Sequence, residues 1–259
     1  MYNLRLGAKR GRDEVESANK KPKEEQNEQL ETACGTTTDD SQLVPVTRPE
    51  FLKAYAIKGM ENVYYKHNWI PSTLAHQWRR ELNDLLEWYR PKLKVYGREI
   101  QQSRKIAAFS TNEGMKLKYS GHDVEMHSPF PPLVEKIAAR LATDECLGKE
   151  VKFNHCMLNM YEDGSINIGK HSDNLENKVI VTVSLGAERT WIMEEKIKRK
   201  KDAMGNKEKV QPKKFKWTLG NGSLLVMQGD VQKLYTHEIP KEPKIKQPRI
   251  SITFRQLIY

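Results

Sequence analysis

The second half of the chain carries the feature that most constrains its fold: a succession of strand-like segments with no helix between them. After residue 150, apolar residues alternate with polar ones, and β-branched and aromatic residues are frequent. The predicted strands are 151–161, 178–185, 190–193, 215–219, 223–227 and 247–258. Successive strands without crossover helices pair antiparallel and close into a sandwich or jelly roll. The sequence therefore predicts a jelly-roll core at about 150–259.

Two segments with helical periodicity precede these strands. In 71–89, Leu74, Trp78 and Leu82 recur at helical spacing behind a Ser-Thr start. A second amphipathic helix is predicted at 132–142, where apolar residues follow a leading proline at every fourth position. The predicted fold class is therefore α+β, mainly β: a double-stranded β-helix (jelly roll) core with flanking helices.

Three connecting segments also carry predictions. Residues 98–131 are turn-rich and irregular, and we expect them to form a binding lid over the core. Gly220-Asn221-Gly222 is typical of a hairpin turn. Residues 194–214 hold 9 Lys and Arg against 4 Asp and Glu, which predicts an exposed basic loop. Contact with phosphates and simple solvation are both open for this loop.

Residues 1–45 are predicted to be a disordered tail, because they are polar and almost free of aromatic residues. Two basic clusters, Lys9-Arg10 and residues 20–23, fit a two-part nuclear import signal, although a solvated charge run has the same composition. We therefore expect an import receptor as a partner and a nuclear location, with the cytoplasm as a second location. Residues 46–259 then form the folded domain.

Charge and composition narrow the choice of partners. The chain has a net charge of +10 and the tail one of −2, so the folded part carries +12. That charge favours a polyanion such as nucleic acid, although many basic proteins are merely soluble. No apolar run approaches the roughly 18–20 residues that span a bilayer, so we expect no membrane partner. Three cysteines without a CxxC pair fit a reducing compartment.

The triplet His171-Ser172-Asp173 is a candidate metal site. Residues i and i+2 of an extended segment face the same side, so His171 and Asp173 can bind one ion while Ser172 faces away. A jelly roll can return His237, 66 residues after His171, to the same place. Two imidazoles and one carboxylate are the ligands of non-haem iron(II) oxygenases. Chance alone also produces such triplets, so this one is weak evidence by itself.

The last predicted strand indicates an anion site. Four polar residues share one face of it: Arg249, Ser251, Thr253 and Arg255. If the apolar face packs against helices, both guanidiniums point inward, where a cation without a counter-charge is very costly. A small dicarboxylate would satisfy both through bidentate hydrogen bonds, and a pair of structural salt bridges is the alternative. Asn159 and Tyr161 share a strand face and offer neutral donors to the same anion.

Taken together, these motifs resemble the signature of the AlkB-type dioxygenases, which use iron(II) and 2-oxoglutarate. The matching elements are Asn159-Met160-Tyr161, His171-Ser172-Asp173, His237 and the run from Arg249 to Arg255. Their order and spacing match across roughly residues 95–259, and the resemblance is to the eukaryotic nucleic-acid repair branch. The combination is far more specific than any one motif.

The resemblance implies a role for each residue. Iron(II) would be held by His171, Asp173 and His237. Arg249, aided by Tyr161, would bind one carboxylate of 2-oxoglutarate; Arg255 and Asn159 would serve its other end, and Thr253 would add a hydroxyl. The family uses O2 to convert 2-oxoglutarate to succinate and CO2 while it hydroxylates a target carbon.

The implied target is an N-methyl group on a base of DNA or RNA, which leaves as formaldehyde once it is hydroxylated. The base must be flipped out of a duplex and held between stacking groups, here Tyr119 and the ring of His171. Lys105, Lys116 and Lys118 of the lid would neutralise phosphates.

Two positions depart from the family pattern. Asn174 stands where repair members carry an acidic residue; its amide can hydrogen-bond a base edge but cannot favour a cationic base by charge. Ser251 stands where the family has asparagine. Three functions therefore remain open: a nucleic-acid demethylase, the same oxygenase acting on a protein or small molecule, and a non-catalytic nucleic-acid-binding jelly roll. The intact metal triplet argues against the third.

Overall fold

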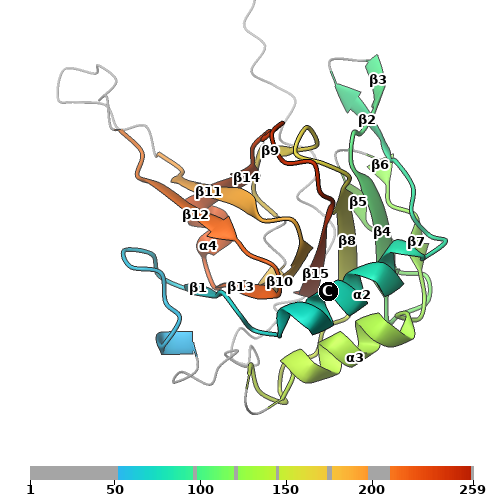
Figure 1. The fold of residues 1–259 in the computed structure, drawn as a ribbon, viewed down its shortest axis with the longest axis horizontal. Helices are drawn as coiled ribbons and strands as arrows, with labels where there is room; N and C mark the ends of the chain where they lie inside the picture. Colours follow the sequence, from blue (N-terminus) through green and yellow to red (C-terminus); the bar gives the residue numbers. More distant parts are fainter. Residues whose placement is uncertain are drawn as a thin grey trace, which may run out of the picture. The chain divides into compact units, whose positions relative to one another are not determined.

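Two β-sheets stacked face to face form the frame of the protein in its computed structural model, which describes residues 52–95, 98–119, 122–143, 146–173, 177–197 and 211–257 (Figure 1). The larger sheet has seven strands in the order β1-β13-β10-β15-β8-β4-β7, and the smaller has four in the order β12-β11-β14-β9. All neighbouring strands pair antiparallel except β4 and β7. The predicted jelly-roll class is confirmed.

The strands have the following bounds. In the larger sheet they are β1 (Val63–Lys66), β13 (Ser223–Gln228), β10 (Asn177–Gly186), β15 (Arg249–Leu257), β8 (His155–Tyr161), β4 (Lys105–Ser110) and β7 (Met126–His127). In the smaller sheet they are β12 (Lys214–Leu219), β11 (Arg189–Glu195), β14 (Tyr235–Ile239) and β9 (Ile168–His171). Two separate pairs are formed by β2 (Lys92–Val95) with β3 (Arg98–Gln101) and by β5 (Lys118–Tyr119) with β6 (His122–Asp123).

The six strands predicted from alternation are all present, as β8, β10, β11, β12, β13 and β15. The short strands β9 and β14 were not predicted, because each spans only four or five residues and has no long apolar alternation. These two strands carry the histidines of the predicted metal site.

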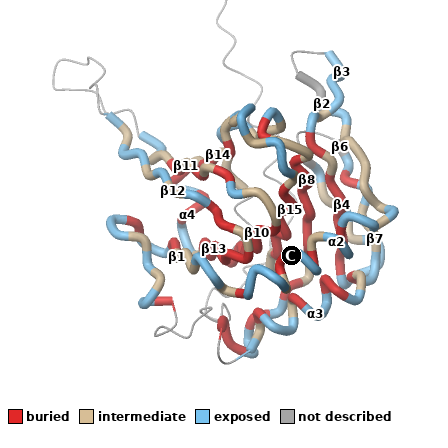
Figure 2. Tube along the Cα trace, viewed as in Figure 1, coloured by how far each residue is buried: buried red, intermediate tan, exposed pale blue. Residues whose placement is uncertain are grey.

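The helices α2 (Ser72–Asn83) and α3 (Pro132–Leu141) cover the outer face of the larger sheet (Figure 1). Their buried residues, including Trp78 and Ile137, join one apolar cluster with Leu158, Ile252 and Phe254 of the sheet. Figure 2 shows buried positions along the central strands β8, β15 and β10 beneath these helices. The apolar face of β15 therefore packs against helices, as predicted, and its polar face turns toward the smaller sheet.

The first helix is shorter than predicted. The sequence predicted 71–89, but α2 ends at Asn83, and Tyr89 instead pairs with Ile106 of β4. The indole N–H of Trp88 donates to the carbonyl of Leu82 at 2.8 Å, which satisfies one of the carbonyls left free at the helix end. By contrast, α3 matches its prediction to within one residue. None of the described helices is long and apolar enough to cross a membrane.

Two predictions about connecting segments are wrong in part. The segment 98–131 is not irregular throughout, because β4 lies within it as a buried strand paired with β8. Gly220-Asn221-Gly222 is not a hairpin turn, because β12 before it and β13 after it belong to different sheets. The turn packs against 67–70: a Cβ on Gly222 would lie 2.6 Å from the carbonyl oxygen of Ile70. A corner between sheets, with this close approach, explains the two glycines.

Other predicted segments lie outside the described residues. They are the tail at 1–45 and residues 198–210 of the basic loop. The strands on either side of that loop, β11 and β12, do form an antiparallel pair, with Glu194 opposite Lys214.

Candidate metal and co-substrate site

The predicted metal ligands meet between the two sheets. In the pairing of β9 with β14, His171 lies directly opposite His237, and their ring centroids are 4.4 Å apart. Asp173 follows β9, and its Oδ2 lies 3.4 Å from Nε2 of His237. The nearest ligand atoms of the three residues all lie within 4.8 Å of one another. The spacing in sequence therefore produces one cluster, as expected.

The surroundings of the cluster hold the ligands in metal-binding protonation states. Burial lowers the pKa of His237 to about 3 and also lowers the pKa of His171, so both imidazoles are neutral near pH 7. Burial alone would raise the pKa of Asp173, but the charges of Arg255 and the two histidines outweigh it and lower that pKa to about 2. Neutral imidazoles and an ionised carboxylate are the forms that bind a metal ion.

Neighbouring groups also orient the ligands. Nδ1 of His171 lies 2.8 Å from the carbonyl oxygen of Gly169, so this contact leaves Nε2 for a metal. The backbone N–H of Asp173 donates to Oε1 of Gln232 at 2.9 Å. The indole of Trp191 stacks on the ring of His237, at 4.8 Å between centroids and 16° between planes. These contacts fix the orientation of all three ligands.

The two arginines of β15 lie at opposite ends of the strand and have different partners. Nη2 of Arg255 donates to Oδ1 of Asp173 at 2.7 Å, so this arginine forms one of the salt bridges considered as the alternative to an anion site. Nη2 of Arg249 donates to the hydroxyl of Ser184, at 2.9 Å, and its guanidinium lies 5.2 Å from the centre of the Tyr161 ring. Burial lowers the pKa of Arg249 to about 10.

Several buried donors of this pair lack acceptors among the described residues. They are Nε and Nη1 of Arg249 and Nη1 of Arg255. Arg249 is 1 % exposed, and a buried cation without hydrogen-bonded counter-charge is costly. A carboxylate placed against Arg249 would accept from both of its free positions. The site therefore fits a ligand that brings an anionic group to this end of β15.

A cavity beside the metal ligands is lined by residues from both sheets. Arg249 is not among its lining residues, although its guanidinium lies 5.2 Å from the ring of Tyr161, which is. The predicted residues on the wall of this cavity are Asn159, Tyr161, Thr253 and Arg255, together with the three metal ligands and Ser251. Across the sheet, Arg249 pairs with Tyr161, Ser251 with Asn159 and Thr253 with Met157. Their division between the two ends of a co-substrate stays a prediction.

Sequence reasoning missed four residues of the site: Arg104, Ser184, Trp191 and Gln232. Arg104 is 4 % exposed, lines the cavity and donates from Nε to Oδ1 of Asn159 at 2.9 Å. Its position just before β4, in a segment predicted to be irregular, gave no signal. Ser184 was detectable, because it alternates with Thr182 on β10 and so faces inward opposite Ser251.

The two predicted base contacts are not placed. The backbone of Tyr119 lies in β5, which pairs with β6, but its side chain is outside the described residues. Asn174 is also outside them. The base clamp of Tyr119 and His171 therefore stays a prediction.

The sequence of the chain matches a known superfamily of enzymes. Residues 62–255 match the model of the 2OG-Fe(II) oxygenase superfamily. The chain belongs to that superfamily. Within it, this oxygenase is related to AlkB proteins: it is 28% identical to the DNA oxidative demethylase ALKBH2 of Arabidopsis thaliana over 76% of this chain and 67% of that protein.

Two mammalian relatives are similar as well. The oxygenase is 28% identical to DNA oxidative demethylase ALKBH2 of Mus musculus, over 69% of this chain and 73% of that protein. It is 28% identical to the alpha-ketoglutarate-dependent dioxygenase alkB homolog 3 of Homo sapiens, over 53% of this chain and 46% of that protein. A solved structure of OsALKBH1 aligns with 76% of this chain and 99% of its own, at 15% identity and a TM-score of 0.47.

The family and the triad together imply iron(II) and 2-oxoglutarate as cofactor and co-substrate. His171, Asp173 and His237 would hold the iron, and the unpaired donors of Arg249 fit a carboxylate of the diacid. Bound together, these groups supply oxidation of a C–H bond by O2. The polar residues of the cavity would position the diacid, and burial keeps both histidines neutral.

Proposed function

We propose that this oxygenase demethylates N-alkylated bases of DNA or RNA, releasing formaldehyde, succinate and CO2. The observation that carries the proposal is the relation to ALKBH2, a DNA oxidative demethylase, over 76% of this chain, together with a metal triad that lies inside the family match at 62–255. Methylated nucleic acid is then the partner, and the net charge of +12 outside the tail supports that choice.

The geometry supports a substrate that reaches into the cavity. His237 is buried, whereas His171 at the end of β9 and Asp173 just after it are half-buried. A base in a duplex cannot approach such a metal, so it must be flipped out and inserted. The exposed ring edge of His171 and the predicted partner Tyr119 would stack on either side of it. Asn174 would contact its edge by hydrogen bonds.

The test is a panel of methylated DNA and RNA oligonucleotides, with methylated peptides beside them, incubated with iron(II), ascorbate and 2-oxoglutarate. We expect loss of a methyl group from at least one oligonucleotide, detected by mass spectrometry, and formaldehyde in equal amount. The variant His171→Ala is the control, because it removes a metal ligand. Turnover of a peptide with none of any oligonucleotide would contradict the proposal and favour the protein-directed oxygenase.

Binding supplies a second test that needs no turnover. Affinity for an oligonucleotide should fall steeply as salt rises, because each neutralised phosphate releases a counterion. A protein that binds nucleic acid but consumes no 2-oxoglutarate would instead support the non-catalytic module.

We also propose that the protein enters the nucleus through an import receptor that binds Lys9-Arg10 and residues 20–23 of the tail. Replacing both clusters with alanine in a fluorescent fusion should shift the protein to the cytoplasm. An unchanged distribution would reject the tail as an import signal.

A further inference from the structure

A line of aromatic rings leads from the metal ligand His237 to the protein surface. Trp191 stacks on His237 with 4.8 Å between ring centroids, and Trp217, opposite Trp191 in the β11–β12 pair, lies 6.4 Å farther on. Tyr65 of β1 follows at 6.4 Å from Trp217. Electrons tunnel readily between aromatic rings at such short spacings, and the line crosses from the smaller sheet to the larger one.

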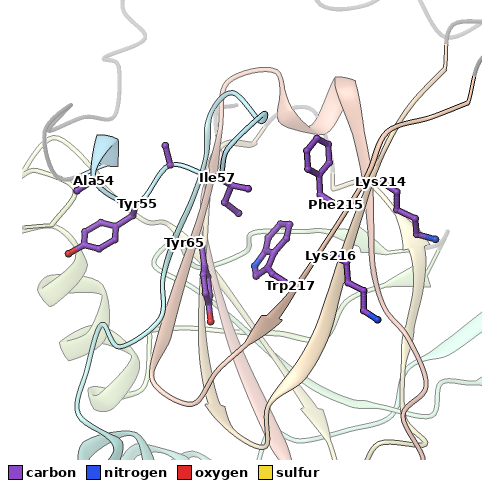
Figure 3. A pocket seen from close by; sticks show the side chains of 9 residues that line it. Ala54, Tyr55, Ile57, Tyr65, Lys214, Phe215, Lys216 and Trp217 are labelled. Carbon is purple, nitrogen blue, oxygen red and sulfur yellow. The ribbon is translucent and has the colours of Figure 1, made fainter.

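The far end of the line opens to solvent. Tyr65 and Trp217 line an open groove of about 500 Å³, together with Tyr55, Phe215 and lysines 214 and 216 of β12. Figure 3 shows the rings of Tyr65 and Trp217 side by side in this groove, with the lysine side chains pointing outward. A small soluble molecule can therefore reach the ring of Tyr65, and the lysines favour a negatively charged one.

The hydrogen bonds along the line differ between its middle and its end. The buried Nε1 atoms of Trp191 and Trp217 have no acceptor among the described residues. The hydroxyl of Tyr65 already accepts from the N–H of Gly220 at 2.9 Å, so its own hydrogen can point to Nδ1 of His67, 3.2 Å away. Oxidation of a phenol is favoured where a base can take its proton.

Packing alone does not explain two tryptophans at these positions. Buried indole N–H groups usually find an acceptor, and a wholly apolar side chain would pack here without leaving a donor unpaired. Without an acceptor for its proton, an oxidised indole would remain a cation radical and would readily oxidise the next ring. The phenol of Tyr65 can lose its proton to His67, so the most stable radical would form on Tyr65.

We propose that Trp191, Trp217 and Tyr65 form an electron path that reduces the iron site when 2-oxoglutarate is consumed without a substrate. Such an event leaves two oxidising equivalents at the metal. Trp191 gives one electron to the metal and receives one from Trp217. Trp217 in turn receives an electron from Tyr65, whose phenolic proton moves to His67. A soluble anionic one-electron donor of the ascorbate class then reduces the Tyr65 radical, and His67 returns the proton.

Two such transfers complete the electron and proton balance of the reaction. Two electrons from the donor and two protons from solvent discharge the two oxidising equivalents, and the oxygen atom not placed in succinate leaves as water. The path thus protects the metal ligands and the indoles from oxidation. This function rests on the family chemistry and not on the identity of the nucleic-acid substrate.

The test locates oxidation in the chain and does not measure demethylation. The full-length protein with iron(II) and 2-oxoglutarate is exposed to O2 without nucleic acid or ascorbate, in the presence of catalase and a nitrone trap that adds covalently to tyrosyl radicals. Peptide mass spectrometry then maps the trap and any oxidised side chains. In the native protein we expect the trap on Tyr65, and none when 2-oxoglutarate is omitted.

The decisive variant is Trp217→Phe, which keeps an aromatic ring at this position but removes the readily oxidised indole and so interrupts the path. We expect trapping at Tyr65 to fall several-fold and oxidation of Trp191 and its neighbours to rise. Trp78→Phe is the matched control, because Trp78 is buried in the cluster beneath the helices, away from this line, and should leave both signals unchanged.

Equal trapping at Tyr65 in Trp217→Phe and in the native protein would overturn the path, as would a native protein oxidised near the metal but not at Tyr65. Should Trp217→Phe fail to fold, Tyr65→Phe serves instead. Freeze-quench electron paramagnetic resonance should then show loss of the tyrosyl signal, with oxidation moved to Trp217. A signal that persists in Tyr65→Phe would equally reject Tyr65 as the end of the path.

Discussion

Two fully buried arginines, Arg189 and Arg249, lie near the same tyrosine ring but differ in their hydrogen-bond partners. Their guanidiniums are 5.5 Å and 5.2 Å from the centre of the Tyr161 ring. Nε of Arg189 donates to Oε2 of Glu242 at 2.9 Å, and its Nη atoms donate to several backbone carbonyls, including that of Pro240 at 2.7 Å. Arg249 donates to the neutral hydroxyl of Ser184, and its Nε and Nη1 have no hydrogen-bond partner in the described part of the chain.

The difference separates a structural cation from a ligand-binding one. A buried charge is tolerated when its hydrogen-bond partners are complete, and Arg189 meets that condition inside the protein. We predict that Arg249 meets it when a ligand brings an anion. Arg255 is intermediate, because Asp173 balances its charge while one of its nitrogens lacks an acceptor in the described part of the chain. Removing each partner in turn tests this distinction.

The largest effect is expected from Asp173→Ala. The change removes a metal ligand and also leaves Arg255 without its counter-charge. Iron binding should be lost, and conversion of 2-oxoglutarate to succinate should fall below detection. Iron content by metal analysis and succinate by mass spectrometry measure the two effects. Wild-type succinate formation in this variant would exclude Asp173 as a ligand.

The next largest effect is on stability, in Arg189→Met. This change removes the cation paired with Glu242, which keeps its two hydrogen bonds from Thr190, and it takes the donor from several backbone carbonyls. Breaking a buried ion pair in this way costs about 3–5 kcal/mol. Urea denaturation of the metal-free protein should show that loss. The fraction that folds should still bind 2-oxoglutarate normally, because the guanidinium of Arg189 already donates to Glu242 and to backbone carbonyls and is not among the groups left without a partner. A loss of affinity without a loss of stability would reverse the roles of the two arginines.

Arg249→Met should show the opposite pattern. The ligand-free protein should be as stable as the native one or more so, because a buried cation with incomplete partners is replaced by an apolar side chain. Binding of 2-oxoglutarate should weaken by about 2–3 kcal/mol, since hydrogen bonds to charged groups are lost, which is roughly 30- to 150-fold in affinity. Isothermal titration measures the affinity, and Arg249→Lys should recover part of it.

A stability loss in Arg249→Met comparable to that of Arg189→Met would mean that Arg249 is structural. Unchanged 2-oxoglutarate affinity would separately remove it from the diacid site. Either result would leave the metal triad intact.

The two arginines of β15 also show what the sequence can predict about the site and what it cannot. Alternation along β15 predicted which residues of that strand face inward, because strand geometry ties side-chain direction to position. It could not distinguish Arg249 from Arg255, since the acceptor of one is Ser184 on β10 and that of the other is Asp173 beyond β9. Those partners depend on how strands are ordered in the sheets, and sequence spacing does not give that order.

Local signals failed where packing between distant segments decides the structure. Arg104 was missed because its role comes from β4 pairing with β8, which places it beside Asn159. The turn at 220–222 was misread because a hairpin and a corner between sheets use the same glycines, and only the contact with 67–70 distinguishes them. The aromatic line from His237 depends likewise on pairing between β11 and β12.

The smallest expected effect is the pH dependence of stability that arises from buried histidines. Unlike an arginine, a buried histidine without partners can become neutral by losing its proton. His155 is fully buried, and neither ring nitrogen has an acceptor or donor within the described residues. Burial lowers its pKa to about 3, as it does for His237. Because these folded-state values lie below the ordinary value of 6.5, the unfolded chain takes up protons first as the pH falls. Stability is then fully present above about pH 6.5 and is lost on the way to about pH 3.

Between pH 7 and pH 5, each of these two histidines should cost the metal-free protein about 1–2 kcal/mol of unfolding free energy. Urea denaturation at both pH values measures the sum. His155→Leu should remove a substantial part of the pH dependence and leave the share of His237 and His171, whose pKa values burial also lowers. His76→Asn on the exposed face of α2 should leave the pH dependence unchanged. An equal pH dependence in His155→Leu would show that His155 is already paired in solution, and would place it with Arg189 among the groups whose partners are complete.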